Sequence, residues 1–149
     1  MRFFVEKINA LGLGWNEKSL TELDLFWICK RLKVTVTEMP LATGGFYYRV
    51  MGRDFIAVDS RLPPLEKLFV LFHELGHFLL HVPESGATAS FHGVGRRTRQ
   101  ECEADAFALC ALIPKAWIVG PSVDQLIEDH GFSREMIVKR VNLFDRYGV

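Results

Sequence analysis

The sequence predicts an α+β fold in which a short sheet precedes a run of helices. Stretches with period-two alternation or β-branched and aromatic residues lie before residue 60, whereas helical spacing dominates after residue 63. Segregation of strands from helices along the chain favours the α+β class over alternating α/β units. Because 149 residues is close to the usual size of one domain, we expect a single compact domain over residues 1–149.

Composition and charge indicate a globular protein and exclude several other classes. Hydrophobic residues make up 49% and charged residues 24%, which is typical of globular proteins. The 18 basic residues balance 18 acidic ones, so no direct nucleic-acid partner is expected. Glu6 and Lys7 interrupt the first apolar stretch, and no apolar run approaches a bilayer's thickness, which predicts no membrane span and a cytoplasmic location. The cysteines form no C-x-x-C pair, so neither disulfides nor a thiolate metal site is expected.

The first elements are expected to be one helix and three strands. Ser19 and Glu22 form a capping-box pattern before apolar residues at helical spacing, and the helix is expected to end in the basic turn 30–33. A turn at Gly52-Arg53 separates the second and third strands. The expected strands lie at 34–37, 46–51 and 55–58.

The second half of the chain is expected to be helical. Pro63-Pro64 suit a first helical turn, and the helix 65–81 should continue until Pro83. Residues 83–97 are rich in Gly, Ser, Ala and Thr, which predicts a mobile surface loop able to act as a lid. The predicted architecture is therefore a three-stranded sheet packed on the helix 65–81, followed by helices over 98–113, 122–131 and 133–147.

An H-E-x-x-H motif, residues 73–77, lies inside the predicted helix 65–81. Four-residue spacing places His73 and His77 on one face, where both imidazoles can bind one zinc ion while Glu74 reaches its water. The alternative is two partly buried histidines bonded to core carbonyls. We predict that His73 and His77 are metal ligands and that Glu74 is the catalytic base.

A third ligand is expected on the following helix. Glu101 and Asp105 are one turn apart and share a face, whereas Glu103 points about 200° away from Glu101. We predict Glu101 as the third ligand and Asp105 as the acceptor of the free ring N–H of His73. Two alternatives stay open: Glu101 could form a capping box with Thr98, and Glu103 or Asp105 could be solvated acids of a first helical turn.

Other polar residues are less well placed. His81 continues the histidine ladder, but the ladder spans about 12 Å, too far for one ion, so His81 is predicted to be a helix-end residue facing the helix dipole. A second donor to the oxyanion is often needed. The sequence does not choose among the candidates His92, Tyr47, Tyr48 and His130.

Two spaced motifs resemble the ImmA/IrrE family of zinc metallopeptidases. They are R-L-P-P at 61–64 leading into H-E-L-G-H-F-L-L-H at 73–81, and E-C-E-A-D-A-F-A at 101–108 closing with L-I-P at 112–114. The resemblance covers residues 55–120 and implies a zincin-like domain with one zinc ion. It also implies that the second motif supplies Glu101 as the third ligand, with Asp105 as its companion where the family more often has Asn.

The same resemblance implies a biological role. Members of the family cleave or otherwise inactivate helix-turn-helix repressors of mobile elements or stress responses. This chain is too short to carry its own helix-turn-helix domain beside the peptidase, so we expect a zinc-dependent endopeptidase with such a repressor as its protein substrate. An extended substrate would add to a sheet edge, expected at 46–50 or 55–58.

The main rival function is a zinc-containing regulatory module that binds a repressor or antitoxin without hydrolysing it. Such a module has no need of Glu74, so the acid beside two metal ligands favours the enzyme. The sequence predicts no oligomeric state.

Overall fold

The computed structural model describes residues 2–81, 89–91 and 98–149 and confirms the α+β class. Backbone contacts group these residues into two compact units. One unit is Thr21–Ala108, and the other joins the residues up to Leu20 with Leu109–Val149. None of the helices in the described ranges is both long and apolar enough to cross a bilayer.

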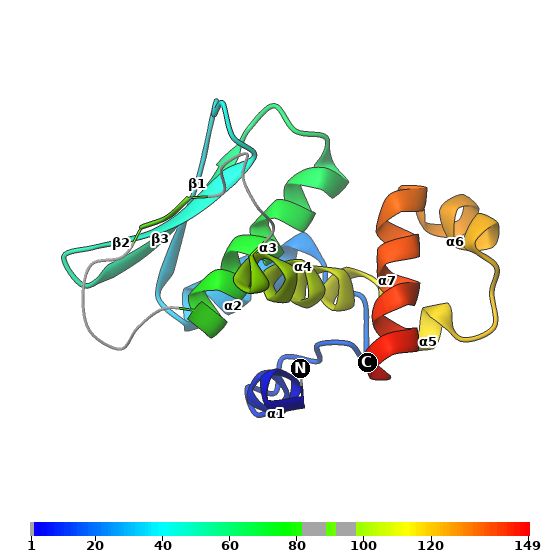
Figure 1. Ribbon diagram of the computed structural model, residues 1–149. Helices are drawn as coiled ribbons and strands as arrows, with labels where there is room; N and C mark the ends of the chain where they lie inside the picture. Colours follow the sequence, from blue (N-terminus) through cyan, green and yellow to red (C-terminus); the bar gives the residue numbers. More distant parts are fainter. Residues whose placement is uncertain (1, 82–88, 92–97) are drawn as a thin grey trace. The chain divides into compact units, whose positions relative to one another are not determined.

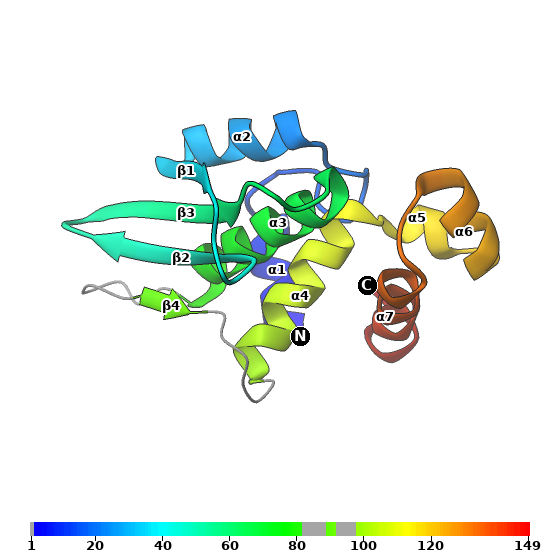
Figure 2. The same cartoon turned by 90° about the horizontal axis from the view of Figure 1, so that it is seen from above.

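The unit Thr21–Ala108 is built on a mixed four-stranded sheet with the order β1-β3-β2-β4 (Figure 2). β1 (Val34–Met39) is parallel to β3 (Arg53–Asp59), and β3 is antiparallel to β2 (Gly45–Val50). The three predicted strands are therefore present. A fourth, β4 (Ala89–Phe91), pairs antiparallel with β2 inside the stretch predicted to be a loop, and the rest of 83–97 lies outside the described residues.

A two-residue turn joins β2 to β3. Val50 pairs with Arg53, and Met51 and Gly52 between them have φ angles of 49° and 72°. Two successive residues in the left-handed region form the turn that matches the twist of a hairpin. The turn thus lies one residue earlier than the predicted Gly52-Arg53.

The predicted sheet edge at 46–50 or 55–58 is wrong. β3 lies between β1 and β2, and β2 lies between β3 and β4, so both strands already have two neighbours. Within the described residues the outer strands are β1 and β4. The cause is the parallel pairing of β1 with β3 and the addition of β4, both long-range pairings that local sequence patterns do not reveal.

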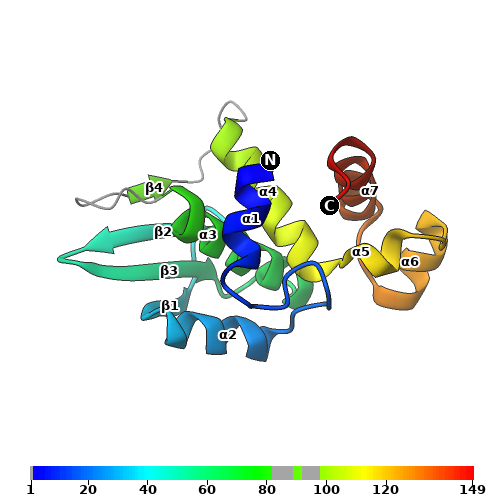
Figure 3. The same ribbon diagram turned by 90° about the horizontal axis from the view of Figure 1, so that it is seen from below.

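Helix α3 (Pro64–His81) packs on one face of this sheet, against β2 and β3 (Figure 1). Tyr47 and Ile56 are register partners on these strands and are buried. Leu71, Phe72 and Leu75 contribute buried side chains from α3. Helix α2 (Glu22–Arg31) runs alongside β1 (Figure 3). This core fixes α3, the helix that carries the H-E-x-x-H motif.

The cap of α2 differs from the prediction. Thr21 is the N-cap, and its side chain accepts a hydrogen bond from the Asp24 backbone while Asp24 accepts one from the Thr21 backbone. The Ser19 hydroxyl instead donates to the Leu112 carbonyl over 2.7 Å. Because a long-range bond engages Ser19, the predicted Ser19–Glu22 box is wrong and the helix begins at Glu22.

The other unit is helical. Its elements are α1 (Arg2–Asn9), the end of α4 (Arg99–Leu112), α5 (Lys115–Ile118), α6 (Val123–His130) and α7 (Arg134–Tyr147). Helices α6 and α7 begin at the predicted caps Ser122 and Ser133, and α6 ends at Gly131 in the left-handed conformation. Helices α1 and α5 were not predicted.

Candidate metal centre

Helices α3 and α4 approach closely at a glycine. A Cβ atom added to Gly76 would lie 3.1 Å from a ring carbon of Phe107 and 3.3 Å from the Ala104 Cα. A larger side chain at Gly76 would therefore push the two helices apart. This close approach lets side chains from the second half of α3 meet side chains from the first turns of α4.

The structure brings His73, His77 and Glu101 together. The His73 Nε2 and His77 Nε2 atoms are 3.2 Å apart. One Glu101 carboxylate oxygen lies 3.3 Å from His73 Nε2, and the other lies 3.4 Å from His77 Nε2. Among the described residues, these three form a group whose ligand atoms could hold a metal ion.

The spacing of these donor atoms fits a tetrahedral ion. Zinc binds imidazole nitrogen and carboxylate oxygen at about 2.0–2.2 Å, so ligand atoms at two corners of a tetrahedron are about 3.3–3.6 Å apart. The observed 3.2, 3.3 and 3.4 Å agree with that separation. Two imidazoles and one carboxylate also form a common donor set of catalytic zinc. The residues present therefore fit a zinc ion.

Asp105 contacts the first histidine. Its Oδ1 atom lies 2.8 Å from His73 Nδ1, and because a carboxylate only accepts, Nδ1–H is the donor. In a neutral ring, the His73 Nε2 atom then carries a lone pair directed at the group of ligand atoms. Glu101 N donates to the Thr98 hydroxyl over 3.2 Å, so Glu101 lies in the capped first turn and still faces the histidines with its side chain.

Glu74 is buried beside the metal-binding group. It follows His73 on α3 and is only 1% exposed. Few carboxylic acids are buried in this way in globular proteins. The fold therefore keeps an acid next to the group that could hold a metal, at the position where the sequence predicts a base.

The structure also shows two functional neighbours that sequence reasoning missed. His81 Nδ1 lies 2.9 Å from His77 Nδ1, and His81 Nε2 lies 3.0 Å from Glu103 Oε2. Glu103 also accepts a hydrogen bond of 2.7 Å from Arg99 Nε. His81 is the last residue of α3, as predicted, but it also contacts His77 and Glu103, and Glu103 is not a solvated acid.

Glu103 is ionised in this arrangement. Burial alone raises its pKa, but hydrogen bonds from His81 and Arg99 outweigh burial and hold the pKa below the ordinary value. The sequence feature that could have predicted the contact between Glu103 and His81 is the pair of small residues Gly76 and Ala104, where α3 and α4 approach each other. With Ala104 at the centre of the helix contact, its two neighbours in sequence, Glu103 and Asp105, flank the contact and reach α3 from opposite sides.

The tyrosines proposed as oxyanion donors have other partners. The Tyr47 hydroxyl donates to Asp54 Oδ1 over 2.5 Å, and Arg49 Nε donates to the same oxygen. Burial, with the hydrogen bond to Asp54, raises the pKa of Tyr47. Tyr48 projects to the opposite face of the sheet from Tyr47 and stacks on Phe55, with ring centroids 4.9 Å apart.

Of the two histidine candidates, only His130 lies in the described part of the chain. His130 belongs to the other compact unit and stacks on Trp117, with centroids 3.8 Å apart. His92 lies outside the described residues. The oxyanion donor is therefore not identified among the four predicted candidates.

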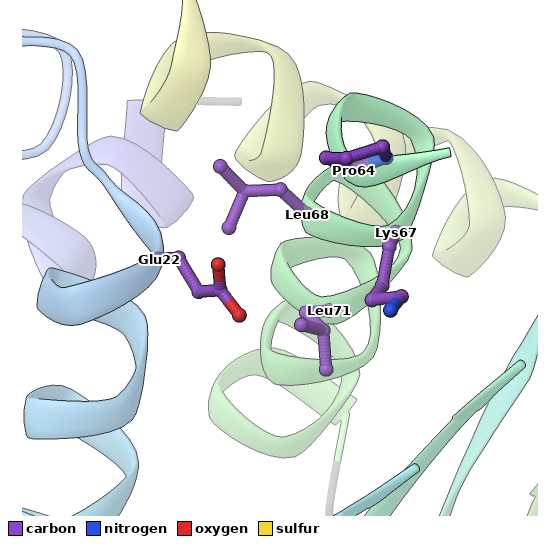
Figure 4. Close-up of a pocket in the computed structure, with 5 residues that line it drawn as sticks. All are labelled: Glu22, Pro64, Lys67, Leu68 and Leu71. Atoms are coloured by element: carbon purple, nitrogen blue, oxygen red, sulfur yellow. The ribbon is translucent and has the colours of Figure 1, made fainter. Parts of the chain in front are cut away.

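A separate pocket lies between α2 and the first half of α3 (Figure 4). It offers one carboxylate and one ammonium group among apolar side chains, so it lacks the donor set of a metal site. Its lining residues are Glu22, Pro64, Lys67, Leu68 and Leu71.

Comparison with known proteins places the chain in a family. The model of a peptidase family, described as the IrrE N-terminal-like domain, matches residues 29–142, which include both α3 and α4. The chain belongs to this family. An uncharacterized immunity region protein 2 of Bacillus phage phi105 is 33% identical to it over 75 residues.

The match to the phage protein covers 50% of this chain and 47% of the relative, so the chain spans about half the length of that relative. No solved structure matches the chain. The family is described as one of peptidases, and the group in this chain that could hold a metal is His73, His77 and Glu101.

Proposed function

We propose that this IrrE N-terminal-like domain is a zinc-dependent endopeptidase that acts in the cytoplasm on a protein substrate. The observation that supports the proposal is the set of separations of 3.2, 3.3 and 3.4 Å among the ligand atoms of His73, His77 and Glu101. They match a tetrahedral zinc site with one position left for solvent or substrate, which is the arrangement of catalytic zinc.

Each residue then has a role. His73, His77 and Glu101 would hold one zinc ion, and Asp105 would orient His73. When bound, the ion would supply a Lewis acid that polarises a peptide carbonyl and lowers the pKa of water. Glu74 accepts the proton from the attacking water on a carboxylate oxygen and then donates it to the departing amide nitrogen.

The proposed substrate is a helix-turn-helix transcriptional repressor, whose cleavage would relieve repression of a mobile element or a stress response. Two observations support this substrate: the resemblance of the motifs to repressor-inactivating peptidases, and the similarity to a phage protein named for an immunity region. DNA would be reached only through the repressor.

The decisive experiment compares the unmodified chain with Glu74→Gln. Each is loaded with zinc and mixed in excess with purified candidate helix-turn-helix repressors, taken first from any genes that adjoin its own, with and without a chelator. We expect about one zinc ion in both proteins, cleavage only by the unmodified protein, and loss of cleavage when the metal is removed. Glu128→Gln, which alters an exposed acid, is the matched control and should cleave normally.

Two outcomes would contradict the proposal. Cleavage by Glu74→Gln would remove Glu74 from the role of base. A zinc-loaded chain that binds the repressor without cutting it would overturn the peptidase and identify the non-catalytic regulatory module instead.

A further inference from the structure

Each ring nitrogen of His77 has a defined neighbour. Nε2 faces His73 and Glu101, and Nδ1 faces His81 at 2.9 Å. Most metal-binding histidines donate their second ring N–H to a carboxylate or carbonyl, which fixes the tautomer and the orientation of the ring. For His73 this acceptor is Asp105, but for His77 the neighbour is another histidine.

Hydrogen bonding decides which nitrogens carry protons. The Glu103 carboxylate is an acceptor only, so His81 Nε2–H is the donor of the 3.0 Å bond to it. In a neutral His81 ring, Nδ1 is then the acceptor, and the 2.9 Å contact requires His77 Nδ1–H as its donor. His77 Nε2 is left with a lone pair directed at His73 and Glu101.

Burial keeps water from replacing His81 as the hydrogen-bond acceptor of the His77 N–H. His77 is only 2% exposed, and the side chains of His81 and Glu103 are 9% and 20% exposed. Water is largely excluded from the His77 ring, so no solvent acceptor replaces His81 readily. The exposed Arg99 guanidinium, which donates to the other Glu103 oxygen, holds the carboxylate at the end of the chain of contacts.

We propose that His81 and Glu103 are positioning residues that act through His77: their hydrogen bonds keep the His77 proton on Nδ1 and direct its Nε2 lone pair at the metal. The inference rests on the proposed function for the presence of the metal. Three residues of the E-C-E-A-D segment of α4 then support the site. Glu101 is a metal ligand, Asp105 accepts the hydrogen bond of His73, and Glu103 accepts that of His81, which contacts His77.

The first test measures zinc affinity by competition with a chelator. His81→Leu removes the acceptor, and its zinc affinity should fall about 10–100-fold, the usual effect of losing a partner of a metal-binding histidine. In His81→Asn, the amide oxygen takes the place of Nδ1, so most of the affinity should return. Glu103→Gln should lie between His81→Leu and the unmodified chain, and Glu128→Gln should bind zinc as the unmodified chain does.

The second test needs no activity. In the zinc-loaded protein, nitrogen NMR of the imidazole rings should report a His77 ring protonated at Nδ1, and this Nδ1–H signal should be lost to exchange with water in His81→Leu and retained in His81→Asn. Thermal melting of the variants shows that each is folded. A merely structural role for His81 would change the melting temperature without changing the Nδ1–H signal.

The outcomes separate this inference from the function it rests on. Equal zinc affinity in all variants, or an Nε2–H tautomer of His77 in the zinc-loaded unmodified chain, would overturn the positioning role and leave the peptidase untouched. An unmodified chain that binds no zinc would remove the peptidase and the positioning role together. Tighter affinity in the unmodified chain and His81→Asn than in His81→Leu would support the positioning role even if the repressor were not the substrate.

Discussion

The two histidines of the candidate metal site depend on different hydrogen-bond acceptors. His73 donates directly to a carboxylate, Asp105, whereas His77 contacts His81, which donates to Glu103. A direct charged acceptor binds an N–H more strongly than a neutral one. We therefore expect the hydrogen bond that orients His73 to be stronger than the one that orients His77.

Asp105 offers a direct test of the stronger side. Asp105→Leu removes the acceptor of the His73 proton, so zinc affinity should fall about 10–100-fold. Asp105→Asn keeps an oxygen acceptor at the same place and should lose much less. Chelator competition measures both, with Asp129→Asn, on an exposed aspartate, as the control. Equal affinity in the Leu and Asn variants would show that the 2.8 Å contact does not support the metal site.

The sequence identifies some site residues more readily than others. The positions of His73, Glu74 and His77 follow from the motif, because helical periodicity alone brings the first and last onto one face. The contacts of His81 and Glu103 could not be predicted in this way. They depend on where α3 crosses α4, and helical angles measured from Glu101 place Glu103 on the wrong side of that crossing.

At the scale of elements, local signals predicted the starts of α6 and α7 but not the pairing of the strands. Ser122 and Ser133 cap α6 and α7 as predicted, because each cap uses only residues of its own turn. Ser19 does not cap α2, since its hydroxyl donates to Leu112, far away in the sequence. The parallel pairing of β1 with β3 and the addition of β4 are likewise long-range features.

The contact between α3 and α4 depends on Gly76. Gly76→Val would place side-chain atoms against Ala104 and Phe107, where even a Cβ lies within 3.3 Å. Overpacking of this kind typically costs about 1–3 kcal/mol, and the shift of α4 should also weaken zinc binding by Glu101. Chemical denaturation and chelator competition measure the two effects. Glu66→Val, at an exposed position of the same helix, is the control for the β-branched side chain.

Two results would contradict this prediction. An unchanged zinc affinity with reduced stability would show that α4 adjusts without moving Glu101. Unchanged stability would show that the contact at Gly76 is looser than 3.1–3.3 Å implies.

Asp59 at the end of β3 fixes the connection between β1 and β2 in a pH-dependent way. Its Oδ1 atom accepts hydrogen bonds from Arg61 Nε, Arg61 N and Leu41 N. The side-chain bond from Arg61 is the main cause that lowers the pKa of Asp59, against the opposing effect of burial. A lowered pKa in the folded state stabilises the fold above the ordinary aspartate pKa of about 4 and loses that effect as the pH falls through the lowered value.

The expected result is a pH-dependent difference between the unmodified chain and Asp59→Asn. At pH 7 the variant should melt a few degrees lower, and the gap should narrow steadily once the pH falls below about 4. Thermal melting across that range measures it, with Asp129→Asn as the exposed control. A gap that stays constant with pH would show that the charge of Asp59 contributes nothing to stability.

At the scale of the whole molecule, the sequence predicts one domain over residues 1–149, and this stays a prediction. The described residues group into two compact units, each with buried side chains of its own, and α4 contributes residues to both. Chain length alone could not reveal this grouping, because the helical unit combines the two ends of the sequence. The experiment that tests the prediction is cooperative unfolding.

Arg140 is the residue whose substitution should destabilise the helical unit in that experiment. It is fully buried on α7, and its guanidinium donates to the carbonyls of Ile113 and Val149 and to the Asn16 side chain over 2.7–2.8 Å. Burial lowers its pKa, yet the guanidinium stays charged because the ordinary arginine pKa is far above neutrality. Three acceptors from separate segments of the helical unit therefore depend on one side chain.

Arg140→Met should lower the stability by about 1–3 kcal/mol, because it leaves the buried Ile113 carbonyl, and the part-buried oxygens of Val149 and Asn16, without this donor. Arg146→Met, on the exposed side of the same helix, is the control. If residues 1–149 unfold as one domain, zinc bound at His73, His77 and Glu101 should raise the midpoint of the same single transition that Arg140→Met lowers. Calorimetry with and without zinc measures both shifts. Two transitions, one sensitive only to zinc and the other only to Arg140→Met, would show that the two compact units unfold independently.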